Sequence, residues 1–179
     1  MDCNPKSKWC DGDNINDHLS YLYSGTVLES VDPYTGAPGK CPATQNLFGL
    51  HQGPVQKFKM QNYEFFNGQS DQSYTTLAEK KPFLTYLEIT NPMRFYKSGI
   101  YTPTDKECDE KKVGGFYLNL DGYSMDMDYN GYYILKFPWS WTFGESGNMK
   151  FIKNKNNDSN TKGLCSFYKY GITIEAQNP

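Results

Sequence analysis

Ser-Met-Asp-Met-Asp-Tyr-Asn-Gly-Tyr-Tyr-Ile-Leu-Lys-Phe, residues 124–137, is the stretch that decides the fold. Apolar and polar side chains alternate in its first half, Asn130-Gly131 is typical of a two-residue turn, and a mainly apolar run follows. The stretch therefore predicts a β-hairpin. Two cross-strand pairs follow from such a turn: Tyr129 with Tyr132, and Met127 with Ile134.

Other runs of aromatic and β-branched residues on both sides of the hairpin predict further strands. They cover residues 19–31, 55–66, 83–90, 93–96 and 116–120, with a half-buried run at 47–50 and one short helix expected at 72–79. The fold class we expect is mostly β: a single antiparallel β domain, a sandwich or a twisted sheet with hairpins and few short helices. Residues 1–20 are predicted to pack on this domain, which comprises residues 21–179.

Aromatic residues dominate the apolar content of the chain. The 179 residues include 15 Tyr, 11 Phe and 3 Trp, although the mean hydropathy is −0.73. Rings must therefore supply much of the buried area. A net charge of −2 without a basic cluster argues against nucleic acid as a partner, and no apolar run approaches the ~20 residues of a membrane-spanning helix.

The five cysteines lie mostly beside turn residues, where cross-links are expected, at Cys3, Cys10, Cys41, Cys108 and Cys165. A chain with few aliphatic residues that is cross-linked by disulfides indicates an oxidising compartment, outside the cell or in the secretory-pathway lumen. The sequence begins Met1-Asp2-Cys3 without a charged and apolar leader, so this interpretation expects a secretory signal that has already been removed. Five cysteines leave one unpaired or joined to another chain, and the favoured pairs are Cys3 with Cys10, and Cys108 with either Cys165 or Cys41. A glycosylation triplet at Asn157 also agrees with secretion.

The hairpin contains a short pattern similar to the start of a calcium loop, with oxygen ligands at Asp126, Asp128 and Asn130. The twelfth position of such a loop would be Phe137 and not glutamate. Strand alternation also explains these carboxylates as the solvated side of a strand. Calcium is the one cofactor that the sequence raises, and the cysteine and histidine spacing does not favour zinc.

The run after the hairpin places Trp139, Trp141 and Phe143 on one face if it is extended. Facing inward, these rings would form the centre of the core. Facing outward, on the edge strand that Pro138 favours, they would form a platform for sugar rings or a membrane interface. Exposed Tyr132 and Tyr133 would serve in the same way.

Residues 21–42 carry a resemblance to a known family. Tyr21-Leu-Tyr-Ser-Gly-Thr-Val27, then Asp32-Pro-Tyr-Thr-Gly-Ala37 and Cys41-Pro42, resembles a repeated pattern in the accessory domain of macrophage-expressed perforin-like proteins. Ser24, Asp32 and Lys40 depart from that pattern. The resemblance implies a disulfide-stapled, β-rich module that touches anionic membranes with a projecting hairpin, without the pore-forming domain itself.

Catalytic motifs are scarce, because the chain has no Gly-x-Ser-x-Gly elbow, phosphate-binding glycine loop or His-Glu-x-x-His helix. The function we expect is a secreted or cell-surface module that binds a membrane surface, a glycan or a partner protein through aromatic strands. One alternative is an assembly subunit of a surface layer, filament or capsid, in which the chain forms oligomers. A second is a hydrolase with an unrecognised pair, either Asp with Glu or a cysteine with His18 or His51.

Overall fold

The computed structural model describes residues 4, 6–8, 11–28, 30, 33, 36–37, 57–153 and 163–177. The chain divides into two compact units. Unit 1 comprises Met1–Tyr63 with Ile174–Pro179, and unit 2 comprises Glu64–Thr173. The boundary that we placed after residue 20 stays a prediction.

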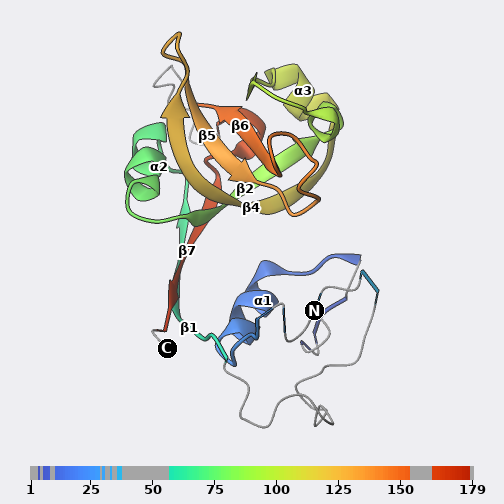
Figure 1. Ribbon diagram of the computed structural model, residues 1–179, viewed down its shortest axis with the longest axis vertical. Coiled ribbons are helices and arrows are strands. Elements are labelled where there is room, and N and C mark those ends of the chain that lie inside the picture. Colours follow the sequence, from blue (N-terminus) through green and yellow to red (C-terminus); the bar gives the residue numbers. More distant parts are fainter. Residues whose placement is uncertain are drawn as a thin grey trace. The chain divides into compact units, whose positions relative to one another are not determined.

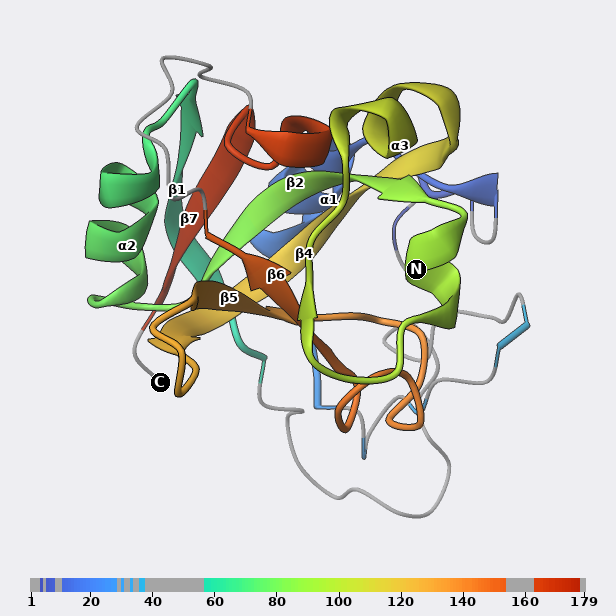
Figure 2. The ribbon, with the colours of Figure 1, turned by 90° about the horizontal axis from the view of Figure 1, so that it is seen from above.

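Short helices and longer strands alternate along the described residues. In chain order they are α1 (Ile15–Leu22), β1 (Met60–Asn67), α2 (Asp71–Ala78), β2 (Phe83–Thr90), the 3₁₀ helix η3 (Pro92–Phe95), β3 (Ile100–Tyr101), α3 (Asp105–Glu110), β4 (Lys112–Met125), β5 (Gly131–Lys136), β6 (Asn148–Ile152), the 3₁₀ helix η4 (Leu164–Ser166) and β7 (Tyr170–Ala176). The strands form a sheet of order β1-β7-β2-β4-β5-β6-β3. In Figures 1 and 2, α2 and α3 lie at opposite ends of the curved β2, β4, β5 and β6 strands.

Strand β2 forms because its side chains alternate between the core and the opposite face of the sheet. It pairs antiparallel with β4, from Phe83 opposite Leu120 to Thr90 opposite Lys112. The register shifts between Ile89 and Thr90, which locally distorts the ladder at the end of β2. Strands β4, β5 and β6 continue the sheet in antiparallel fashion, whereas β3 pairs parallel with β6.

The core of unit 2 is built largely of rings, as the composition predicts. Tyr74 is fully buried and lies within 5.5 Å, centroid to centroid, of three other rings, those of Phe83, Phe167 and Tyr168. Its hydroxyl donates to the carbonyl of Tyr170 at 3.1 Å, so the phenol is satisfied inside the core. Aliphatic side chains of β2, β4 and β5 fill the space between the rings, including Leu87, Leu118, Leu120 and Leu135.

One glycine of β4 is explained by a close approach across the sheet. A Cβ atom on Gly115 would lie 2.1 Å from the hydroxyl oxygen of Tyr86. Because this distance is far below any van der Waals contact, the position admits no side chain unless the Tyr86 ring moves.

The structure confirms the coarse fold class: mostly β, with few helices and a disulfide. The fine description was wrong in one respect, since the parallel pairing of β3 with β6 makes the sheet mixed. The strand predicted at 83–90 and the helix predicted at 72–79 are present as β2 and α2.

Two predicted strands begin in helices instead. The run that begins at Leu19 starts within α1, because the side chain of Asn14 accepts from the amide of Asn16 and caps a helix that buries Leu19. The run at 93–96 lies in η3, where Pro92 supplies a φ suited to the first turn of a helix. The run at 47–50 lies outside the described residues.

The hairpin of β4 and β5 is present, but its register was predicted wrongly. Met125 lies opposite Gly131 and Ser124 opposite Tyr132, so the connection spans residues 126–130. Met127 is 98% exposed and Tyr129 has a φ of 59°, which places both in the connection and not in the ladder. Among the described helices, none has the length and apolar character needed to span a membrane.

Candidate functional site

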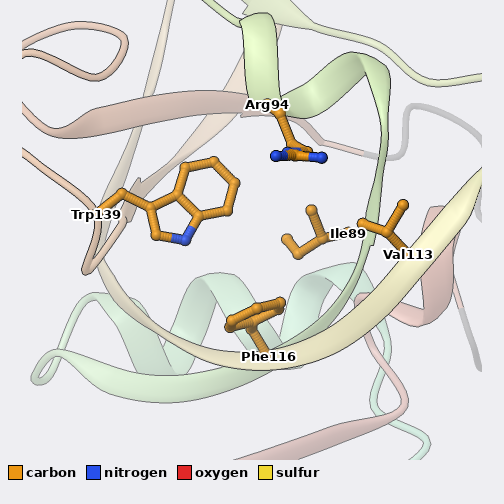
Figure 3. A pocket seen from close by; sticks show the side chains of 5 residues that line it. All are labelled: Ile89, Arg94, Val113, Phe116 and Trp139. Carbon is orange, nitrogen blue, oxygen red and sulfur yellow. The ribbon is translucent and has the colours of Figure 1, made fainter. Parts of the chain in front are cut away.

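A pocket of about 510 Å³ lies on unit 2, lined by Ile89, Arg94, Val113, Phe116 and Trp139. Its size falls in the range of small-ligand and peptide side-chain sites. Figure 3 shows the side chains of Arg94, Trp139 and Phe116 approaching the same space from three directions. The pocket therefore has apolar walls and one cationic group.

Four separate segments position the lining residues. Ile89 stands near the end of β2, Arg94 in η3, Val113 and Phe116 in the first half of β4, and Trp139 in the connection after β5. The β2–β4 ladder sets Leu87 opposite Phe116 and Ile89 opposite Gly114. The pocket thus depends on the pairing of β2 with β4.

Ring contacts hold Trp139 in place. Its ring lies 4.9 Å from that of Phe137, 4.8 Å from that of Phe143 and 6.4 Å from that of Phe116, centroid to centroid. Phe137 is buried, so Trp139 rests on a ring that belongs to the core. Such edge and tilted ring contacts fix orientation as well as burying apolar area.

The connection that carries Trp139 is tied down by Glu145. Its carboxylate accepts from the amide of Gly99 at 2.9 Å and pairs with the ammonium of Lys150 at 2.7 Å. The hydrogen bond from Lys150 is the largest cause that lowers the pKa of Glu145 below its usual value, and the hydrogen bond from the Gly99 amide is the second largest. The connection is therefore anchored by a charged group at neutral pH.

Arg94 supplies the positive charge of the pocket. It is exposed, and its Nη1 donates to the side-chain oxygen of Asn91 at 3.5 Å. A guanidinium keeps its charge and presents several donors in one plane, a geometry suited to a carboxylate. The pocket can therefore accept an apolar side chain together with an acidic group.

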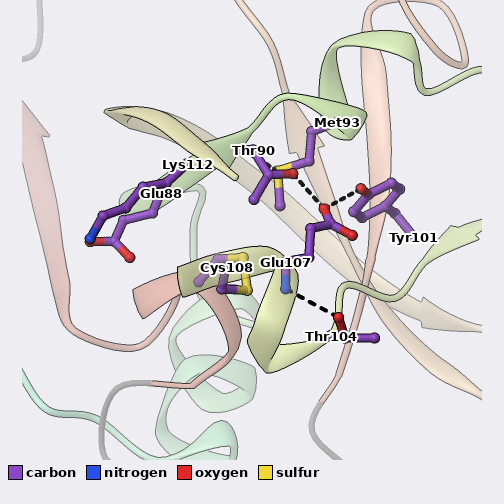
Figure 4. The surroundings of a disulfide bond; sticks show 9 residues. Glu88, Thr90, Met93, Tyr101, Thr104, Glu107, Cys108 and Lys112 are labelled. Atoms are coloured by element: carbon purple, nitrogen blue, oxygen red, sulfur yellow. Dashed lines mark hydrogen bonds and ion pairs between the residues drawn. A yellow bond between two sulfur atoms is a disulfide. The ribbon is translucent and has the colours of Figure 1, made fainter. Parts of the chain in front are cut away.

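Two carboxylates near the Cys108–Cys165 disulfide, those of Glu88 in β2 and Glu107 in α3, are engaged with other side chains (Figure 4). Glu107 accepts from the hydroxyl of Tyr101 at 2.5 Å and from that of Thr90. Burial, with the Glu107 hydrogen bond adding to it, raises the pKa of Tyr101 to about 12. Glu88 pairs with Lys112 at 3.7 Å.

A second hollow, of about 410 Å³, lies between the end of β1 and α2. Phe66 and Leu77 are the apolar residues that line it, and the polar ones are Glu64, Gln69, Gln72, Ser73, Thr76 and Thr173. Among the described residues that line it, Glu64 is the charged one, so this hollow presents a carboxylate where the Arg94 pocket presents a guanidinium.

Of the predicted aromatic face, only Trp139 lines the pocket. The segment is not an extended strand: Phe143 is half-buried and packs against Phe137 and Trp139, whereas Trp141 is 80% exposed. Tyr132 is half-buried, with Lys150 Nζ 5.4 Å from its ring centroid. Tyr133 is fully buried, and its hydroxyl donates into α2, to Asp71.

The disulfide joins Cys108 and Cys165, one of the two pairings that the sequence left open for Cys108. The predicted glycosylation site and the other three cysteines lie outside the described residues: Asn157, Cys3, Cys10 and Cys41.

The Asp126 carboxylate organises the hairpin connection. It accepts from the amides of Asp128 and Asn130 at 3.0 and 2.7 Å, and from the Asn130 side chain at 3.0 Å. Within the part of the chain that the structure describes, no three His, Cys, Asp or Glu side chains gather as metal ligands would. Calcium at Asp126, Asp128 and Asn130 stays a prediction.

The sequence interpretation missed Ile89, Arg94, Val113 and Phe116. The predicted strands at 83–90, 93–96 and 116–120 contain Ile89, Arg94 and Phe116, but this assignment does not show that their side chains enclose a pocket. One signal was available, because Arg94 is the only arginine among the 179 residues.

Known proteins are similar to this chain over nearly all of its length. The family model described as papain family cysteine protease matches residues 1–170. Chymopapain of Carica papaya is 27% identical over 172 residues, and the match covers 94% of this chain and 44% of chymopapain. A cathepsin L-like protein of Caenorhabditis elegans is 26% identical, and the match covers 93% of this chain and 48% of that protein. The chain thus spans about half the length of these relatives.

Solved structures share the fold. A bromelain protease from Ananas comosus, in complex with the E64 inhibitor, superposes with a TM-score of 0.75 at 19% identity, covering 97% of this chain and 74% of that one. A cysteine protease of Carica candamarcensis superposes with a TM-score of 0.73 at 21% identity.

These matches overturn two predictions. The resemblance of residues 21–42 to the accessory domain of perforin-like proteins is wrong, since the family match extends over almost the whole chain. The predicted binding module is likewise wrong as the main function, and the hydrolase that was the second alternative agrees better with the matched proteins. A turn-rich pattern of Gly, Pro and Cys was too short to distinguish the families.

Proposed function

Because this chain belongs to the papain family of cysteine proteases, we propose that it acts on polypeptides and that the Arg94 pocket receives a peptide side chain. The chemistry of the pocket carries this proposal. Three apolar or aromatic side chains and the edge of an indole suit an apolar side chain, and the guanidinium suits a carboxylate beside it. The preferred peptide has an apolar residue next to Asp, Glu or a terminal carboxylate.

The compartment that we propose is the secretory-pathway lumen or a space derived from it. The Cys108–Cys165 disulfide supports this location, because such bonds persist in oxidising surroundings.

Arg94→Gln tests the recognition of the acidic group. The substitution should weaken binding of a peptide with an apolar residue next to a carboxylate (an acidic-apolar peptide) about two- to fivefold, as expected for the loss of one solvent-exposed ion pair. Binding of the same peptide with that carboxylate replaced by an amide should stay unchanged. Fluorescence anisotropy of a labelled peptide gives both affinities. Lys97→Gln is the matched control, because Lys97 is an exposed cation shortly after Arg94 that does not line the pocket.

Phe116→Ala tests the apolar part of the pocket. Removing this ring should weaken binding of peptides with large apolar side chains more than that of peptides with alanine. Phe95→Ala is the control, because Phe95 is 72% exposed and lies outside the pocket. Equal effects of the two variants on peptide affinity would show that the pocket does not bind the apolar side chain.

A further inference from the structure

The tip of the β4–β5 hairpin, residues 126–130, has the composition that the proposed function assigns to a preferred peptide. Its sequence is Asp-Met-Asp-Tyr-Asn, so an apolar side chain stands between two acidic ones. Large apolar side chains at and beside the tip are exposed to solvent: Met125 at 62%, Met127 at 98% and Tyr129 at 81%. Exposed apolar side chains that cluster are typical of interaction sites, and methionine adapts its shape to the surface that it meets.

The two carboxylates of the hairpin tip have different roles. Asp126 is held inside the connection, where its carboxylate accepts from the amides of Asp128 and Asn130. Asp128 is exposed, and within the part of the chain that the structure describes its carboxylate has no hydrogen-bond or ion-pair partner. The hairpin tip therefore offers a carboxylate directly beside Met127, on a loop whose shape is already fixed. A loop that is ordered before binding loses little conformational entropy when it binds.

The Arg94 pocket is complementary to the hairpin tip in both respects. Val113 and Trp139 are 56% and 39% exposed, so its apolar walls are open to an incoming side chain. The guanidinium of Arg94 is exposed and points into the same space (Figure 3). A guanidinium binds a carboxylate through two parallel hydrogen bonds. The apolar walls thus suit Met127, and Arg94 suits the carboxylate of Asp128.

The hairpin tip cannot reach the pocket of its own chain. The pocket takes Val113 and Phe116 from the start of β4, whereas the hairpin tip follows Met125 at the end of this 14-residue strand. At about 3.3 Å per residue, roughly 30 Å of strand separates them. The ladder between β4 and β5 continues up to Met125 opposite Gly131, so the connection is too short to bend back. A hairpin tip that occupies the pocket must come from another molecule.

On the basis of the proposed function, we infer that the Arg94 pocket binds the hairpin tip of a second copy of this chain. Met127 packs against the apolar walls, and Asp128 pairs with Arg94. Because the pocket and the hairpin tip are different surfaces, the contact is head-to-tail, and a bound pair keeps one free tip and one free pocket. One loop in one pocket buries less area than a stable dimer needs, so the contact forms at high protein concentration and competes there with peptides.

Sedimentation velocity tests this self-association from about 10 μM to about 1 mM protein, the range of weak contacts. The weight-average sedimentation coefficient of the wild-type protein should rise with concentration, past the value of a dimer. Two double variants should each lose this rise: Met127→Ser with Asp128→Asn in the hairpin tip, and Arg94→Gln with Phe116→Ala in the pocket. Asp121→Asn is the control and should behave as wild type, because Asp121 is exposed on β4 outside the hairpin tip.

Mixing the two double variants gives the sharpest result. One has an intact pocket and the other an intact hairpin tip, so an equimolar mixture should form pairs of chains and nothing larger. A symmetric contact between identical surfaces would not be restored in this way. A mixture that stays monomeric, while the wild type associates, overturns the inference.

Other results separate the inference from the proposed function. Wild-type protein that stays monomeric up to about 1 mM overturns the inference. Association that an excess of the acidic-apolar peptide does not reverse also overturns it, since another surface then joins the copies. Anisotropy of the labelled peptide with the hairpin-tip variant decides the proposed function independently. Binding at the wild-type affinity leaves that function standing whatever the sedimentation shows, and absence of binding to both proteins refutes the function and the inference with it.

Discussion

Two buried tyrosine hydroxyl groups of unit 2 donate to one carboxylate. Asp71, at the start of α2, accepts from Tyr133 at 2.9 Å and from Tyr168 at 2.5 Å through the same oxygen, Oδ1. Burial, with the negative charge of Asp71 adding to it, raises the pKa of Tyr133 far above its usual value. The phenol therefore stays a neutral donor, and β5, α2 and the residues after η4 are joined at one side chain.

Tyr133→Phe should lower the free energy of unfolding by about 1–2 kcal/mol, because it deprives Asp71 of a donor inside the protein. Urea denaturation measures the change. Tyr132→Phe, on the same strand and half-buried, is the control and should change stability by less than about 0.5 kcal/mol. Equal effects of the two variants would show that the hydroxyl of Tyr133 adds nothing to stability.

Tyr101 makes the protein sensitive to alkaline pH. Its pKa is about 12 in the folded chain, against 10.0 for an unperturbed phenol, so the folded state retains a proton that the unfolded state loses. Stability from this group is complete below pH 10 and declines as the pH rises to about 12. We expect the midpoint of urea unfolding to fall over this interval, and to fall less in Tyr101→Phe. Tyr129→Phe, at an 81% exposed position, should follow the wild-type curve.

At the scale of elements, the connection between β4 and β5 is held by the side chain of Asp126. Three hydrogen bonds to this carboxylate take the place of the ladder within residues 126–130. Tyr129 adopts a left-handed φ inside that connection. A side-chain cap of this kind makes a longer loop stable where a two-residue turn was predicted.

Asp126→Ala should destabilise the hairpin by about 1 kcal/mol, since the amides of Asp128 and Asn130 lose their acceptor. Amide hydrogen exchange of β4 and β5 locates the effect, and thermal unfolding gives its size. Asp128→Ala is the control in the same connection. Faster exchange in β5 that is equal in both variants would contradict this role of Asp126.

Local patterns predicted those elements whose own residues determine them. β2 alternates between buried and half-buried residues from Phe83 to Ile89, and the expected helix at 72–79 begins beside Ser70, whose hydroxyl accepts from the amide of Ser73. Residues 19–22 of α1 were assigned to a strand because aromatic and β-branched residues favour strands, while the cap at Asn14 and the burial of Leu19 favour the helix. The Arg94 pocket was not predictable in this way, since four separate segments form it.

At the scale of the whole molecule, the Cys108–Cys165 disulfide closes a loop with a sequence separation of 57 residues. It joins α3 to η4, two short helices with little packing surface of their own. A bond across such a separation stabilises the protein mainly by restricting the unfolded chain.

Replacing both Cys108 and Cys165 by alanine should lower the free energy of unfolding by about 2–4 kcal/mol. Urea denaturation with and without dithiothreitol measures this effect. Reductant should destabilise the wild-type protein by a similar amount and have no further effect on the double variant. Destabilisation of the double variant by reductant would show that another disulfide contributes.

Family membership could not be read from composition, because the fold similarity extends over most of the chain at 19–21% identity, where few residues coincide. The pattern at residues 21–42 was a local coincidence of turn residues, as the match across residues 1–170 shows. The match across residues 1–170, and not any short motif, shows the family of this protein.

Arg94 being the sole arginine has a practical consequence. A dicarbonyl reagent such as phenylglyoxal, which reacts with guanidinium groups, has one such target on each molecule, and that target borders the pocket. The fraction of chains shielded from the reagent would count occupied pockets directly, on unmodified protein and without a label on the peptide.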